Sequence, residues 1–66
     1  MKQALYLFTR AKGLARMNAA REACPWFVVR ERHGFVARPV RDFAQECWKI
    51  GPLGEVQHLT NAVTND

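Results

Sequence analysis

Two apolar runs near the middle of the chain form the clearest pattern in the sequence. Residues 26–29 read Trp-Phe-Val-Val and residues 35–37 read Phe-Val-Ala, with a polar segment between them that ends in Gly34. Aromatic and β-branched runs joined by a short segment containing glycine are typical of a β-hairpin. We therefore predict a hairpin over residues 26–40. Pro39 has no amide hydrogen, so we expect the second strand to lie at an edge of its sheet.

The loop of this hairpin decides which side chains share a face. A two-residue loop at His33-Gly34 would mix charged and apolar side chains on both faces. A three-residue loop, Arg32-His33-Gly34, puts glycine at the left-handed position that such loops need, and we prefer it. One face is then apolar and contains Phe27, Val29, Phe35 and Ala37. The opposite face mixes rings, branched side chains and arginines, namely Trp26, Val28, Arg30, Val36, Arg38 and Val40.

The segments before the hairpin predict a strand and then a helix. Residues 4–8 are apolar on both faces, which is typical of a buried strand. Residues 11–24 have helical periodicity, and Pro25 excludes the helical conformation for the residue before it. We expect the core-facing stripe of this helix to be Leu14, Met17, Ala20 and Cys24. A second, smoother ridge consists of Ala11, Ala15, Ala19 and Ala23.

The segments after the hairpin predict a second helix and a short strand. Asp42 can cap a helix over residues 43–50, and Gln45 can reach back to the cap. Gly51 followed by proline would then stop that helix. Residues 54–60 alternate weakly, which suggests one more short strand, and we expect residues 61–66 to fray.

Together these elements predict the α+β class, in the order β-α-β-β-α with an antiparallel hairpin and a short C-terminal strand. Residues 1–60 would form a single domain, since a chain of 66 residues is too short for two. A mostly helical chain, with one long helix over residues 3–24 ahead of the hairpin, is the alternative architecture.

The charge of the chain is unevenly distributed. Residues 1–41 carry nine basic and two acidic side chains, whereas residues 42–66 carry one basic and four acidic side chains. The net charge is +4 and the pI is about 9.7. A basic body can bind a polyanion, or it can be neutralised by the acidic end when the chain folds. Both interpretations remain open from the sequence.

Residues suited to catalysis or metal binding are sparse. The chain has no serine, and Cys24 and Cys47 lack the spacing of a metal or redox motif. We expect both thiols to be buried and free of a disulfide bond. This usage is typical of the reducing cytoplasm, where we expect the protein to be located. His33 and His58 are too scattered to supply the remaining ligands of a metal site. We therefore predict a non-catalytic protein without metal or cofactor. No apolar run approaches the ~18 residues of a membrane span.

Binding is the function that the sequence favours. Arginines lie on and beside the hairpin next to aromatic residues, a combination common in interfaces with proteins and with nucleic acids. The predicted partner-binding residues are Trp26, Val28, Arg30, Arg32, Arg38, Val40 and Arg41, with Lys12 and Arg16 as further basic contacts.

We predict a small basic, protein-directed adaptor or inhibitor, of the minimal type found in phages and mobile elements. Its partner would be a protein, for example in a nucleic-acid-processing complex. Phosphate contacts with nucleic acid are the first alternative, and a homo-oligomeric structural element is the second.

Overall fold

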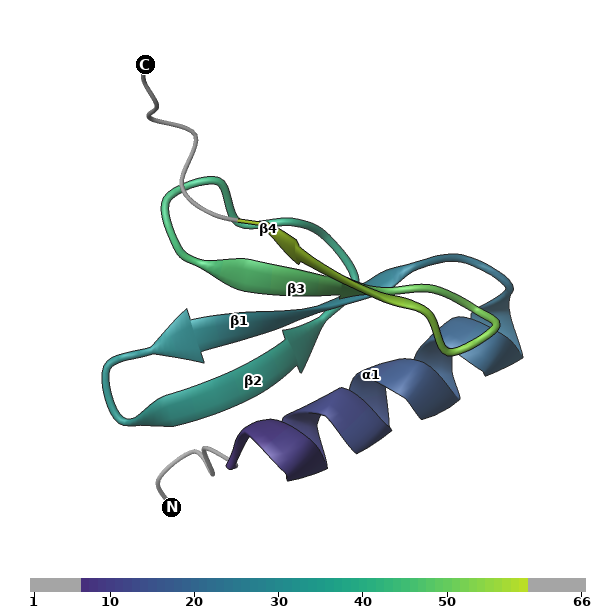
Figure 1. Ribbon diagram of the computed structural model, residues 1–66, viewed down its shortest axis with the longest axis horizontal. Coiled ribbons are helices and arrows are strands. Elements are labelled where there is room, and N and C mark those ends of the chain that lie inside the picture. The colour runs from purple at the N-terminus through teal and green to yellow at the C-terminus, as the bar shows by residue number, and fades with distance from the viewer. Residues whose placement is uncertain (1–6, 60–66) are drawn as a thin grey trace.

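One helix packs on a four-stranded antiparallel sheet in the computed structural model, which describes residues 7–59 (Figure 1). The elements are α1 (Phe8–Glu22), β1 (Trp26–Glu31), β2 (Gly34–Arg38), β3 (Cys47–Ile50) and β4 (Val56–Leu59). The strand order is β2-β1-β3-β4, and every neighbouring pair is antiparallel. The α+β class is therefore confirmed, whereas the predicted order of elements is not.

Helix α1 begins earlier than the sequence pattern suggested. Leu7 is the extended N-cap and Phe8 is the first helical residue, so the predicted strand over residues 4–8 is wrong at Phe8, and residues 4–6 lie outside the described residues. The helix ends where Ala23 adopts a left-handed conformation, with φ at 57°, and its N–H donates to the carbonyl of Ala19. Pro25 then prevents continuation, as expected.

The face of α1 that packs on the sheet is the alanine ridge. Ala11, Ala15 and Ala19 are completely buried, and Ala11 and Ala15 belong to a core cluster with Val28 and Ile50. Small side chains let the helix backbone approach the sheet closely, so the sheet supplies most of the core volume. The predicted stripe is wrong: Leu14 is only half-buried, and the remaining three are exposed, namely Met17, Ala20 and Cys24.

The predicted hairpin forms, but its loop is Arg32-His33. Glu31 pairs with Gly34, and Val29 pairs with Val36, so both loops considered from the sequence are wrong. The pairing moves β2 by one residue relative to the preferred prediction, and a one-residue shift exchanges the faces of a strand. Phe35 and Ala37 consequently face α1, together with Trp26, Val28 and Arg30 of β1.

The opposite face of the sheet has its own apolar cluster. Val29 and Cys47 are completely buried there, Val36 is nearly so, and Phe27 and Leu59 pack against them. Strands β2 and β3 are both antiparallel to β1, so they run in the same direction. Residues 39–46 must therefore carry the chain back across the length of the sheet between them.

The predicted second helix is wrong, because residues 47–50 form strand β3. Asp42 does act as a local cap: its carboxylate accepts a hydrogen bond from the N–H of Ala44 at 2.9 Å, and the N–H of Gln45 donates to the carbonyl of Asp42 at 3.2 Å. This closes a turn, not a helix. Cys47 and Ile50 are then buried on opposite faces of the sheet.

Strand β4 lies within the segment where a short final strand was predicted. A tight turn precedes it, in which the N–H of Gly51 donates to the carbonyl of Glu55 at 2.8 Å. Gly54 in this turn has φ at +91°, and the side chain of Arg16 from α1 lies close against it. The predicted fraying of residues 61–66 concerns positions outside the described residues.

Candidate functional site

A cluster of rings and charges lies on the helix-side face of the sheet, at the end next to the first turn of α1. We call it the aromatic–arginine patch and define it as Arg30, Phe35, Glu46, Trp48 and His58. The sheet register assembles it: Arg30 pairs with Phe35 across β1 and β2, and Trp48 pairs with His58 across β3 and β4. Glu46 immediately precedes β3, and its carbonyl accepts the N–H of Arg30 at 2.9 Å.

Aromatic contacts fix the apolar part of the patch. Phe8 from α1 meets Phe35 and Trp48 edge-on, with ring centroids 5.3 and 4.8 Å apart, and Phe35 lies 5.7 Å from Trp48. Edge-to-face rings at these separations attract one another beyond their burial. The imidazole of His58 stacks on the indole of Trp48 at 4.9 Å, with 13° between the planes. Phe8 therefore connects the patch to the helix.

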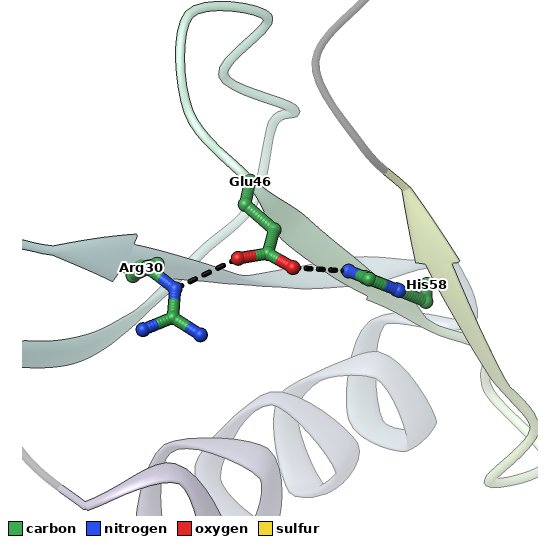
Figure 2. A network of polar contacts seen from close by, with 3 residues as sticks. All are labelled: Arg30, Glu46 and His58. Atoms are coloured by element: carbon green, nitrogen blue, oxygen red, sulfur yellow. Dashed lines mark hydrogen bonds and ion pairs between the residues drawn. The ribbon is translucent and has the colours of Figure 1, made fainter.

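A polar network crosses the patch (Figure 2). The Nε of Arg30 donates to one carboxylate oxygen of Glu46 at 2.7 Å, and the other carboxylate oxygen contacts Nε2 of His58. The guanidinium of Arg30 also lies 5.4 Å from the ring of Phe35 and 5.9 Å from that of Trp48. Its two terminal nitrogens point away from Glu46 in Figure 2, so they can still donate to a partner.

Glu46 is the anionic centre of this network. The hydrogen bond from Arg30, and after it the one from His58, hold the pKa of the Glu46 carboxyl below its ordinary value of 4.5. Glu46 is therefore ionised at neutral pH. The side chains of Arg30 and His58 are 55% and 46% exposed, so the network lies at the surface, where a macromolecule can touch it.

The predicted binding residues of β1 differ in their accessibility. Val28, predicted as a contact residue, is completely buried beneath α1 and has no exposed surface to offer a partner. Trp26 is half-buried, and its indole N–H donates to Glu22 at 3.1 Å. Arg30 alone of these three residues belongs to the patch.

The other predicted binding residues do not form one surface with Arg30. Arg38 lies on the opposite face of the sheet and pairs with Glu31 at 3.5 Å. Arg32 is exposed at the hairpin tip. Val40 is 66% exposed and lies with Arg41 in the connection between β2 and β3, where the guanidinium of Arg41 covers the ring of Phe43 at 4.4 Å. The single mixed face predicted over residues 26–40 is therefore wrong.

The additional basic residues lie on α1. Arg16 is exposed and packs against the turn before β4, and Lys12 is half-buried. Neither forms an ion pair with an acidic residue in the part of the chain that the structure describes. They add positive charge to the molecule without entering the aromatic–arginine patch.

Sequence reasoning missed Glu46, Trp48 and His58. The sequence pattern predicts a helix at Trp48 and only a weak strand at His58, so it does not indicate that the two side chains meet. The signal that could have found them is the stretch 51–54, Gly-Pro-Leu-Gly, which is typical of a turn. Interpreted as a hairpin turn, it brings residues 47–50 and 56–59 into register.

Side chains that commonly ligate metals are dispersed over the described residues. No group of three or more His, Cys, Asp or Glu side chains gathers anywhere in residues 7–59. Cys47 is buried and Cys24 is exposed, both as free thiols, so the predicted burial of Cys24 is wrong. Over the same range, no helix combines the length and apolar character that a membrane span requires.

Comparisons of this chain with protein-family models, with curated proteins and with solved structures found no match. The function is therefore inferred from the geometry of the described residues.

Proposed function

We propose that this chain is a non-catalytic binding module that docks on a protein partner, as an adaptor or an inhibitor, through the aromatic–arginine patch. One observation supports this most: a surface arginine and a tryptophan lie close together, held by neighbours on α1, on β2, on β4 and in the residue before β3. Tryptophan and arginine are the residues that most often dominate the binding energy of protein interfaces.

The patch is ordered before any partner arrives. Phe8 and Phe35 fix the indole of Trp48, and Glu46 fixes the guanidinium of Arg30. Immobilising a flexible side chain on binding costs about 0.5–1.5 kcal/mol. The hydrogen bond to Glu46 already restricts the side chain of Arg30, so less conformational entropy would be lost on binding and more of the contact energy would contribute to affinity.

The charges of the patch favour a protein over a nucleic acid. Glu46 places an ionised carboxylate between Arg30 and His58, and its lowered pKa keeps it ionised at neutral pH. A phosphate backbone carries only negative charge, so it would meet repulsion at the centre of the patch. A protein surface can offer a carboxylate to the terminal nitrogens of Arg30 and a donor to Glu46.

Nucleic-acid binding is the second candidate function, and a separate observation favours it. Lys12, Arg16 and Arg32 form no ion pair within residues 7–59, and the chain carries a net charge of +4. These residues could contact phosphates independently of the patch. Such binding would weaken steeply with salt, because bound counterions are released.

The two candidates are separated by capture with matched variants. Tagged wild-type protein, R30A and K12A are incubated with nuclease-treated lysate, and the captured protein is then purified for titration. Docking through the patch predicts that R30A weakens binding at least ~10-fold, as expected for an interface anchor, while K12A binds like the wild type. Circular dichroism of R30A verifies that its fold is retained.

The opposite pattern contradicts docking through the patch. Partners that disappear on nuclease treatment, together with oligonucleotide binding that weakens with salt and depends on Lys12, would establish the second candidate instead. We propose the cytoplasm as the compartment, since Cys24 and Cys47 are unpaired thiols of the kind that a reducing environment preserves.

A further inference from the structure

Within residues 7–59, no strand pairs with the outer edge of β4. Among the described strands, β4 is the last of the sheet and pairs only with β3. The N–H of Gly51 donates to Glu55, and hydrogen-bonded pairs alternate along an antiparallel ladder. Gln57 therefore directs its N–H and C=O toward β3. Val56 and His58, one residue to either side, direct theirs away from the sheet.

This edge lacks the features that normally prevent strand pairing. Natural edges carry charged side chains, proline or bulges. β4 reads Val-Gln-His-Leu and contains no lysine, arginine, proline or acid. The other edge strand, β2, ends in Arg38, which is paired with Glu31, and Pro39 follows it. The two edges of this sheet are thus unequally protected.

We propose that a second copy of this chain pairs with this edge, β4 against β4 and antiparallel, so that one sheet continues across both copies. A two-fold axis at Gln57 sets Gln57 opposite Gln57 of the second copy and Val56 opposite His58 of the second copy. In this register the outward N–H of each Val56 and each His58 meets an outward C=O of the other copy.

The side chains of β4 suit a second copy. Val56 is 45% exposed, and it would be covered by the imidazole of the other copy, which is itself stacked on Trp48. On the opposite face, Lys49 lies beside Gln57, so two glutamines separate the lysines of the two copies. Copies that each carry +4 repel one another, and a strand without lysine or arginine is where their approach costs least.

The pairing is distinct from the proposed docking on a protein, although it affects how that docking works. A two-fold axis between antiparallel strands stands perpendicular to the sheet, so both helices and both aromatic–arginine patches would lie on the same face. Two patches on one face can engage a repetitive or dimeric partner together, which raises the apparent affinity.

Backbone N-methylation tests the pairing without changing a side chain. A chain of 66 residues can be assembled by chemical synthesis with an N-methyl group at His58, which blocks its outward N–H. The matched control carries the group at Ala37. Arg30 donates its N–H toward β3, so by alternation Val29 and Phe27 bond to their β2 partners Val36 and Arg38, and the N–H of Ala37 points outward at the β2 edge. Sedimentation equilibrium gives the mass of each form.

We expect the unmodified chain and the Ala37 form to reach twice the monomer mass of 7.6 kDa at high micromolar concentration. The His58 form should remain a monomer with an unchanged circular dichroism spectrum. An unmodified chain that stays monomeric at every concentration overturns the proposal, and so does a dimer that survives methylation of His58.

Amide hydrogen exchange provides a second measurement if the methylated chain fails to fold. In the unmodified chain, the amides of Val56 and His58 should become protected as its concentration rises, whereas the amide of Ala37 should not. Exchange at Val56 and His58 that is independent of concentration overturns the proposal.

Discussion

Ala15→Leu is the sharpest test of how the helix packs on the sheet. Ala15 lies at the middle of the ridge that α1 presents to the sheet and is completely buried against a core containing Val28 and Ile50. A leucine there adds three carbon atoms at a position with no exposed surface. The helix would have to move away from the sheet, or the leucine would adopt an unfavourable rotamer.

The expected loss of stability follows from the cost of overpacking. Inserting extra methylene groups into a close-packed core destabilises a protein by about 1–3 kcal/mol. For a domain of this size, each kcal/mol lowers the melting temperature by about 4–8 °C. We therefore expect Ala15→Leu to melt at least several degrees below the wild type. Ala20→Leu, on the exposed side of the same helix, should change stability by no more than about 0.5 kcal/mol.

Urea unfolding measures both variants under one set of conditions. Trp26 and Trp48 are both half-buried beside α1, so tryptophan fluorescence should follow the loss of this packing, and circular dichroism follows the helix. Equal slopes against urea would show that only stability changed. If Ala20→Leu destabilised as much as Ala15→Leu, the alanine ridge would not face the sheet, and the stripe containing Met17 would have to be reconsidered.

Further predictions concern two glycines and one carboxylate. Gly13→Ala should stabilise the helix by about 0.5–1 kcal/mol, since the added Cβ would meet no side chain and no other element within 4 Å. Gly54→Ala should destabilise the protein by about 1 kcal/mol or more, since φ is +91° and the Cβ would lie 3.1 Å from the Nε of Arg16. Both are read from thermal melting. The pKa of Glu46 is lowered by the hydrogen bonds from Arg30 and His58, so its contribution to stability is present above pH 4.5 and is lost as the pH falls through the lowered value. Urea titrations of wild type and Glu46→Gln should therefore differ at neutral pH and converge in acid; a constant difference would contradict this.

The hairpin could be predicted from the sequence, whereas its register could not. The apolar runs of residues 26–29 and 35–37 are strong local signals, and the structure pairs them. The register depends on the loop, and Arg32-His33 has no glycine to mark it. Burial decided the outcome: the observed pairing places Val36 against Val29 in the second apolar cluster and Phe35 beneath α1. The choice between registers therefore depends on contacts with β3 and α1, and the local sequence of the hairpin carries no information about these contacts.

The predicted core-facing stripe of α1 is wrong because hydrophobicity and packing favour different residues. Leu14 and Met17 are the more apolar side chains, and they indicated a core stripe. The sheet, however, already presents Val28, Ile50 and half-buried rings, so little volume remained for large helix side chains. Ala11, Ala15 and Ala19 fit that space, and this choice cannot be recognised until the opposing surface is known.

The aromatic–arginine patch could not be predicted because its contacts span long sequence separations. Arg30 and Glu46 are 16 residues apart, and Glu46 and His58 are 12 apart. Their meeting requires β3 to insert beside β1, and its four residues are too few to distinguish a strand from a helix by periodicity. The local sequence around Arg30 predicts it as a binding residue. Its partners can be identified only once the strand order β2-β1-β3-β4 is known.

Both proposals have one physical origin, which is that a single helix is too narrow for this sheet. A helix with its side chains is about 10–12 Å wide, whereas outer strands in a four-stranded sheet lie about 14 Å apart. α1 packs on β1, β2 and β3, and among the described elements it makes no packing contact with β4. Within residues 7–59, the β4 side of the helix-side face is therefore covered by the stacking of His58 on Trp48 and by the carboxylate of Glu46. The aromatic–arginine patch therefore remains at the surface on that side of the sheet. The edge of β4, which carries no lysine, arginine or acidic residue, lies directly beside it.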